Sequence, residues 1–203
     1  MTEPVALVAG TAAPLIRPNI DTDQIIPSRE MKSVGKTGLA DGLFAGWRYL
    51  RTGSREPDPD FILNHPGFAH APILLGGSNF GCGSSREHAV WALHEYGVRA
   101  VIAASFAPIF RGNCVRNGII PVVLAEDAVE AIAAAGDLVT VDLLAQSVSC
   151  GTLRFGFEID PSAKAMLAEG LDAIDLTFKH RDAIVAFQVR DRLARPWVYL
   201  EGA

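Results

Sequence analysis

The sequence predicts an α/β domain in which parallel strands are joined by antiparallel ones, and three observations lead to this prediction. The chain has 203 residues, which corresponds to one domain or at most two. From residue 71 onward, short apolar runs alternate with segments of helical periodicity, as they do where helices connect parallel strands. Residues 152–159 alternate between apolar and polar instead, which is typical of an antiparallel strand with one exposed face.

Residues 1–70 are rich in turn formers and predict an irregular N-terminal part, with short strands at about 4–9 and 13–17. Residues 51–60 (RTGSREPDPD) combine prolines with charges, which oppose regular structure and predict an exposed loop. Glycines are frequent in the wider span 28–60. We therefore expect that span to be poorly ordered in the lone chain, because few apolar contacts would leave its ordering entropy uncompensated.

Residues 71–195 predict the α/β core and residues 196–203 a tail, so that 1–203 is expected to form one domain. Apolar runs mark the buried strands, and apolar positions three and four apart mark helix faces, as in residues 89–96. Gly136 is a typical helix end. The expected elements are strand 71–76, helix 85–96, strand 100–105, a helical or irregular turn 107–117, strand 119–124, helix 126–135, strands 139–143 and 152–159, and helices 161–170 and 173–193.

Composition and charge exclude several classes of protein. Hydrophobic residues make up 49% and charged residues 20% of the chain, as in ordinary globular proteins, so disorder is excluded as the main state. The net charge is 18 − 23 = −5, and nucleic-acid binding, which relies on a positive surface, is not expected. No apolar run approaches the roughly 20 residues that span a bilayer, and no leader pattern opens the chain, so we expect no membrane association.

The cysteines predict neither a disulfide framework nor a metal site. Cys82, Cys114 and Cys150 are an odd number at wide spacings, and the chain contains no CxxC or HxxxH pair. Cys82 lies in a glycine-rich loop, where it is either a nucleophile or a small packing residue, and no histidine pattern of a cysteine hydrolase favours the first. We expect a cytoplasmic protein with no metal or cofactor on this chain.

The most informative segment is Gly76–Ala89 (GGSNFGCGSSREHA), between a predicted strand and a predicted helix. Ser84 followed by Glu87 matches a helix capping box. The helix would then direct free backbone N–H groups and the positive end of its dipole at an anion. Arg86 would add a planar charge suited to a carboxylate. The alternative is a cap without a ligand, although Ser85 and Arg86 are more than a cap requires.

Two further segments carry candidate residues. In Asn19–Pro27 (NIDTDQIIP), Asp21 and Asp23 form either an acidic loop near the anion site or a local Asx turn. Phe110–Cys114 follows a predicted strand end, where α/β proteins place ligand contacts. Lys36 lies in a glycine-containing loop and is most simply solvated.

Together these segments resemble the aconitase swivelling-domain superfamily. The resemblance rests on NIDTDQIIP (19–27), TGLADGLFAGWRY (37–49), NFGCGSSREHA (79–89) and SFAPIFRGNCVRNGIIPV (105–122), on their order and on the chain length. Within the superfamily, residues 3–190 are similar to the small subunits of 3-isopropylmalate dehydratases. The resemblance implies an α/β swivelling domain of β/β/α type, with a mixed sheet, a partly open barrel and flanking helices.

The resemblance also implies a shared active site. A separate large subunit would hold a 4Fe–4S cluster, so this chain would act in a hetero-oligomer and carry no cofactor itself. The implied reaction removes water from 2-isopropylmalate and returns it to give 3-isopropylmalate, on the route to leucine. Ser84 resembles the catalytic serine that takes the carbon-bound proton, Ser85 and Arg86 resemble substrate-binding residues, and Asp23 resembles an aspartate that supports them. Lys36 falls near the position of a substrate-binding arginine.

Two other functions stay open. The same type of subunit acts on homocitrate or citramalate elsewhere in the superfamily, and residues 28–49 are expected to decide between these diacids. A non-catalytic anion-binding module, which would function without a partner chain, is the other alternative.

Overall fold

The structure is a computed structural model that describes residues 3–31 and 35–199. This part of the chain forms two four-stranded sheets. One sheet is antiparallel, in the order β1-β6-β7-β8, and the other is parallel, in the order β2-β3-β4-β5. The strands are β1 (Leu7–Gly10), β2 (Ala12–Leu15), β3 (Ile73–Gly76), β4 (Ala100–Ala103), β5 (Ile120–Val123), β6 (Val139–Asp142), β7 (Ser147–Cys150) and β8 (Leu153–Gly156).

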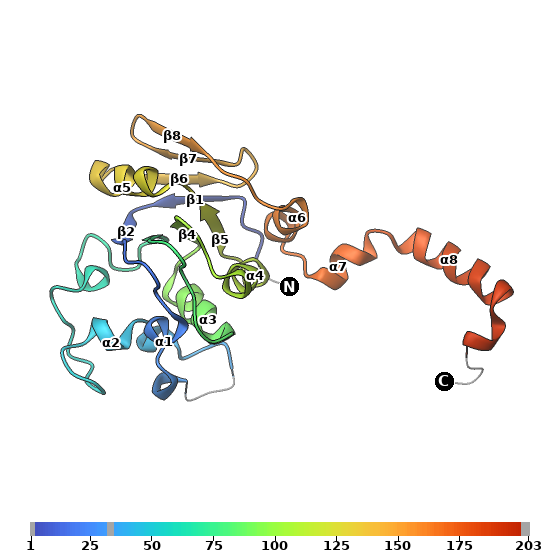
Figure 1. Cartoon of the computed structure of the whole chain (residues 1–203), viewed down its shortest axis with the longest axis horizontal. Helices are drawn as coiled ribbons and strands as arrows, with labels where there is room; N and C mark the ends of the chain where they lie inside the picture. Colours follow the sequence, from blue (N-terminus) through green and yellow to red (C-terminus); the bar gives the residue numbers. More distant parts are fainter. Residues whose placement is uncertain (1–2, 32–34, 200–203) are drawn as a thin grey trace.

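Helices flank the sheets and connect the parallel strands (Figure 1). Short 3-10 turns lie at Ser28–Glu30, Ala40–Gly42, Ile62–Asn64 and Pro196–Val198. None of the helices in the described ranges is long and apolar enough to cross a membrane. The helices are α1 (Thr22–Ile25), α2 (Ala45–Arg48), α3 (Glu87–Tyr96), α4 (Pro108–Arg116), α5 (Glu126–Ala135), α6 (Pro161–Glu169), α7 (Ala173–Phe178) and α8 (Arg181–Ala194).

The parallel sheet is buried on both faces, because successive residues of a strand point to opposite sides. In β3, Leu74 joins an apolar cluster with α1, α2, α3 and α4. Its neighbours Ile73 and Leu75 join a second cluster, which the antiparallel sheet, α5 and α6 complete. Strands covered in this way read as continuous apolar runs. The predicted parallel and antiparallel pairings are both present, each in its own sheet.

Most expected elements lie within a few residues of their predicted positions, and two expectations were wrong. Strand β7 was not expected, because Ser147–Cys150 alternates serine with apolar residues over a short span before the turn at Gly151. The expected helix 173–193 is two helices, since α7 ends before Lys179 and α8 begins at Arg181.

The expectation of few apolar contacts in residues 28–60 was also wrong for the described part of that span, which leaves out residues 32–34. Leu39, Leu43 and Phe44 are fully buried in the cluster beneath α1 and α3. The ring of Phe44 lies 5.9 Å from Trp47 and 5.9 Å from Phe61, centroid to centroid. The glycines of this span allow its turns, but aromatic and leucine side chains anchor it to the core.

The C-terminal helices form an arm, residues 173–199, that leaves the body of the molecule beyond α6 (Figure 1). No residue of α7 or α8 is buried. The predicted tail folds back on this arm instead of the body: the hydroxyl of Tyr199 donates to Asp191, and the Arg192 guanidinium lies over the Tyr199 ring. The described part of the tail is therefore an extension of α8.

Candidate active site

The three segments that carry the sequence motifs meet at one end of the parallel sheet. We call residues 76–86, which link β3 to α3, the glycine-serine loop. On one side the loop pairs with the segment before α1: the Gly81 N–H donates to Ile20 and the Thr22 N–H donates to Cys82. On the other side it pairs with the segment after β4, where the Phe80 N–H donates to Ser105. These contacts fix the loop between chain segments distant in sequence.

A glycine is required at position 81 for two reasons. Its φ of +76° lies in the left-handed region, which side chains with a Cβ disfavour. A Cβ at this position would also lie 2.1 Å from the Phe110 ring. Because the backbone can approach that ring closely, the loop packs directly against α4.

The glycine-serine loop enters α3 differently from the predicted capping box. The N-cap residue is Arg86 and has no side-chain cap, so the expectation that Ser84 caps the helix was wrong. The cause is a tertiary contact, because the Thr22 hydroxyl donates to the Ser84 carbonyl at 2.9 Å and the chain turns there. The Ser84 side chain is thereby left exposed. In the described residues, the N–H groups of Glu87 and His88 have no acceptor.

A pocket of about 190 Å³ opens over this loop. The candidate residues Ser84, Ser85 and Arg86 line it, together with Thr22 and residues 107–110 and 113 at the start of α4. The Arg86 guanidinium pairs with the Asp23 carboxylate at its rim, and both side chains retain solvent access. Two serines and an arginine, just before the N-terminus of α3, thus line one small space, an arrangement that favours a carboxylate ligand.

Lys36 does not line this pocket. Its Nζ donates to Asn117 at 3.2 Å and lies over the Trp91 ring, 5.4 Å from its centroid. Asn117 is buried and saturated: its Oδ1 also accepts from Trp91, and its Nδ2 donates to Glu87 and to the Asn113 carbonyl. Lys36 therefore holds its loop against the ends of α3 and α4, next to the pocket.

Several known proteins are similar to this chain over most of its length. The Aconitase C-terminal domain family model matches residues 2–127. A 3-isopropylmalate dehydratase small subunit from Cupriavidus necator is 56% identical over 207 residues, which cover 98% of this chain and 100% of that one. The chain belongs to the 3-isopropylmalate dehydratase small-subunit family. A crystal structure of 3-isopropylmalate dehydratase from Methanocaldococcus jannaschii matches with a TM-score of 0.66 at 30% identity, covering 90% of this chain and 99% of that one.

Membership of the small-subunit family confirms the resemblance and the fold class read from the motifs. Residues from the segments 19–27, 79–89 and 105–122 line the same pocket. Sequence reasoning gave no role to Thr22, Asn113 or Asn117. Thr22 and Asn113 lay within segments that had been singled out, but their partners are far away in sequence and no local pattern names them.

The cysteines of this family member lie apart from one another. Cys114 is fully buried in the cluster under α3, and Cys150 is buried in the cluster between the sheets. Burial raises the pKa of both thiols, so neither is a ready thiolate. Cys82 is half-buried in the glycine-serine loop. Among the described residues, no group of three His, Cys, Asp or Glu side chains could hold a metal ion.

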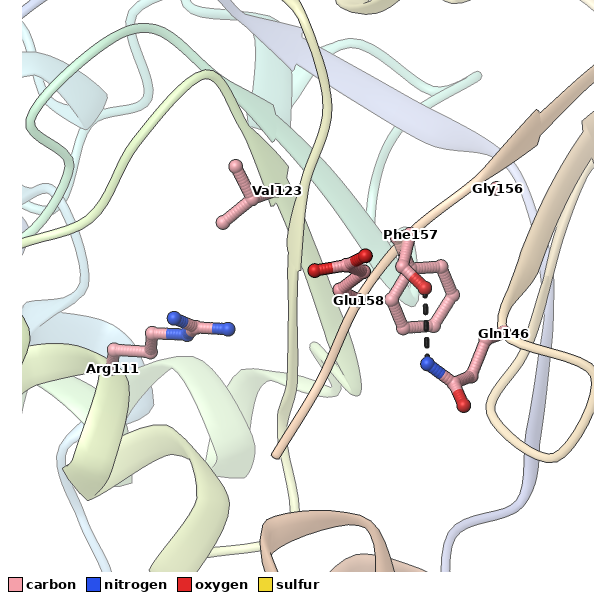
Figure 2. Close-up of a pocket in the computed structure, with 6 residues that line it drawn as sticks. All are labelled: Arg111, Val123, Gln146, Gly156, Phe157 and Glu158. Atoms are coloured by element: carbon pink, nitrogen blue, oxygen red, sulfur yellow. Dashed lines mark hydrogen bonds between the residues drawn. The ribbon is translucent and has the colours of Figure 1, made fainter. Parts of the chain in front are cut away.

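A larger cavity, of about 660 Å³, lies elsewhere on this small-subunit fold. Figure 2 shows Arg111 of α4 directed across it toward Glu158, in the segment that follows β8, with Gln146 and Phe157 on the far side. Gln146 donates to the Phe157 carbonyl at 3.1 Å. Arg111 comes from the motif segment 105–122, but none of the candidate residues Asp23, Lys36, Ser84, Ser85 and Arg86 lines this cavity. The smaller pocket at Ser84, where the hydroxyls, the guanidinium and the helix end meet, is the candidate active site.

Proposed function

We propose that this chain is the small subunit of a 3-isopropylmalate dehydratase and supplies the proton-transfer and substrate-binding half of its active site. The reaction is a hydro-lyase reaction: 2-isopropylmalate loses water to give 2-isopropylmaleate, which regains water as 3-isopropylmalate, in leucine biosynthesis. One observation carries the proposal. Ser84, Ser85 and Arg86 face one pocket at the N-terminus of α3, in a chain 56% identical to a named small subunit.

In this proposal Ser84 takes the carbon-bound proton as an alkoxide and returns it during rehydration. As that C–H bond breaks, its electrons form the new double bond and the hydroxyl group leaves; a general acid, which the large subunit would have to supply, gives it the proton that makes it water. A serine hydroxyl is a weak acid, so its anion needs stabilisation. The Arg86 guanidinium and the acceptor-free N–H groups of Glu87 and His88 supply it, as preorganised donors do for oxyanions elsewhere.

Ser85 and Arg86 would bind a substrate carboxylate. The ion pair with Asp23 supports this assignment, because it fixes the direction of a guanidinium whose planar donors match a carboxylate. Asp23 is thus a positioning residue in the proposal. A direct contact between Lys36 and substrate stays a prediction, since the Lys36 ammonium is engaged by Asn117.

We further propose that a large subunit completes the enzyme and carries the 4Fe–4S cluster, whose open iron would polarise the leaving hydroxyl. The arm supports a protein partner, because Phe178, Phe187, Val189, Leu193 and Trp197 are each at least half exposed. Contiguous exposed apolar surface of this kind marks protein interfaces.

Reconstitution tests the proposal. The purified chain alone is expected to convert neither isomer, and mixing it with the large subunit should restore hydration of 2-isopropylmaleate, followed by ultraviolet absorbance. Homocitrate and citramalate serve as competing substrates and distinguish the related diacid enzymes. Turnover by the chain alone, or a reconstituted complex without hydro-lyase activity on any of these diacids, would overturn the proposal and favour an anion-binding module.

A further inference from the structure

Asn113 borders the candidate active site from the opposite wall to the glycine-serine loop. It lies in the second turn of α4, is only 4% exposed, and lines the same pocket as Ser84, Ser85 and Arg86. A buried amide carries strong donors and an acceptor, and their partners indicate which part of it faces the pocket.

The orientation of the Asn113 amide is fixed by Arg116, one turn further along α4. The Arg116 guanidinium donates to the Asn113 Oδ1. A guanidinium has no acceptor, so the amide must present its oxygen to Arg116 and direct its NH₂ group away. The Asn113 backbone carbonyl is occupied as well, because it accepts from the backbone and side-chain nitrogens of Asn117.

The Asn113 Nδ2 group has no acceptor among the residues that the structure describes. Every fully buried side-chain nitrogen or oxygen in that part of the chain has a hydrogen-bond partner. Nδ2 therefore retains access to open space, and the space beside Asn113 is the pocket. An otherwise buried side chain thus holds an unpaired donor toward a ligand site, where leaving a donor unsatisfied is unfavourable.

We propose that Asn113 is a substrate-binding residue whose Nδ2 donates a hydrogen bond to a carboxylate oxygen of the hydroxy-diacid; this inference rests on the proposed function. The group offers donors only on that side, so its ligand must be an acceptor. With Arg86 on the facing wall, the two side chains hold an anion between a charged and a neutral donor. The neutral amide would orient the carboxylate through a directional hydrogen bond without adding a second positive charge to the pocket.

Two substitutions test this in the reconstituted holoenzyme. Asn113→Asp keeps an oxygen for Arg116 but turns an oxygen to the pocket, and Asn113→Ala removes the donor without adding charge. Both should lower kcat/KM mainly by raising KM, by roughly 10- to 100-fold for Asn113→Asp, the range for hydrogen bonds to charged groups. Arg111→Gln is the control, because it makes the same charge change on the same helix but faces the other cavity. Its kcat/KM should stay within about twofold of wild type.

Thermal unfolding and assembly with the large subunit are measured first. Folded, assembled Asn113 variants with a KM equal to that of Arg111→Gln would overturn the inference. If the wild-type complex turns over no diacid, the proposed function is wrong whatever the role of Asn113. Calorimetric titration with 2-isopropylmalate then tests Asn113 as a binding residue by itself. Binding to wild type that weakens at least about tenfold in Asn113→Asp supports Asn113 as a binding residue. No binding to wild type overturns both proposals.

Discussion

At the scale of single residues, different groups of Ser84 and Arg86 make the structural contacts and face the candidate site. The carbonyl of Ser84 is held by Thr22, while its hydroxyl is left free to face the pocket. The next charged residue, Arg86, is held by Asp23. Structural contacts therefore use the backbone of Ser84 and one edge of Arg86, and the reactive groups of both remain available.

Ser84→Ala and Arg86→Lys are expected to fail in different kinetic parameters. Loss of a base removes an interaction made mainly in the transition state, so Ser84→Ala should lower kcat at least about a hundredfold with little change in KM. Lysine keeps the charge of Arg86 but loses its two-point geometry, so KM should rise with a smaller fall in kcat. Steady-state kinetics of the reconstituted enzyme measure both.

The control for Ser84→Ala is its thermal unfolding. Since the side chain does not cap α3, the variant should unfold at the wild-type temperature. A folded, assembled Ser84→Ala enzyme with near-normal kcat would remove Ser84 from the mechanism and move the search for the base to Ser85 or to the large subunit.

At the scale of elements, much of the fold was predictable because burial on both faces leaves a strong apolar signal. Strands β3, β4 and β5 are of this kind. The errors occurred where tertiary contacts override the local sequence pattern. Thr22 contacts the Ser84 carbonyl in place of the predicted cap, and Leu39 and Phe44 are buried in a span whose glycines suggested few apolar contacts. The sequence predicted which segments line the candidate site. It could not predict the direction of the Asn113 amide, because that depends on the contact with Arg116 and no local sequence pattern indicates it.

The loop before α2 is attached to α3 by Glu95. Its carboxylate accepts the N–H groups of Gly38, Leu39 and Ala40, at 2.6, 2.5 and 2.9 Å. Desolvation opposes the charged form, but these backbone hydrogen bonds outweigh it and lower the pKa of Glu95. Since the folded-state pKa lies below the unfolded value of about 4.3, the stabilisation is complete above that pH and is lost as the pH falls through the folded pKa.

Glu95→Gln should therefore lower the unfolding temperature at pH 7, and the difference from wild type should disappear as the pH falls below about 4. Glu130→Gln on α5 is the matched control, because that exposed glutamate makes no hydrogen bond or ion pair in the described residues. Thermal melts of wild type, Glu95→Gln and Glu130→Gln across this pH range measure the differences in unfolding temperature. An acid-independent effect of Glu95→Gln would show that the carboxylate charge does not hold the loop.

Alanine substitutions at Gly81 and Gly53 allow the cost of backbone strain to be distinguished from the cost of a steric clash. Both have positive φ, +76° and +80°, but a Cβ at Gly53 meets nothing within 4 Å, whereas at Gly81 it meets the Phe110 ring. Gly53→Ala should cost about 1–2 kcal/mol, the strain of a left-handed residue. Gly81→Ala should cost clearly more and also lower activity, because the loop must move off α4. If chemical denaturation gives both variants the same loss in free energy of unfolding, the contact between Gly81 and the Phe110 ring is not tight.

At the scale of the whole molecule, the chain divides into a body with two apolar clusters and an arm with none. The body contains every residue of the candidate site and both sheets. The arm buries no residue in α7 or α8, and its charges, five Lys and Arg against three Asp over residues 173–199, give +2 in a chain of net charge −5. Such an element adds surface for association and contributes little to the stability of the body.

Removing the arm should consequently separate folding from assembly. A chain ending at Leu171 keeps α6 and its capping contacts and loses the exposed ion pair of Glu169 with Lys179. It should unfold within a few degrees of the full chain, because α7 and α8 hold no buried residue. Its affinity for the large subunit should fall.

Replacing Val185, Val189 and Leu193 by glutamine removes a row of apolar side chains from one side of α8 without shortening the chain. This variant should also bind the large subunit more weakly. Differential scanning calorimetry of the lone chain and sedimentation of the mixture measure the two effects. A large loss of thermal stability on truncation would show that the arm packs on the body in solution, and unchanged assembly by both variants would place the partner's contacts on the body instead.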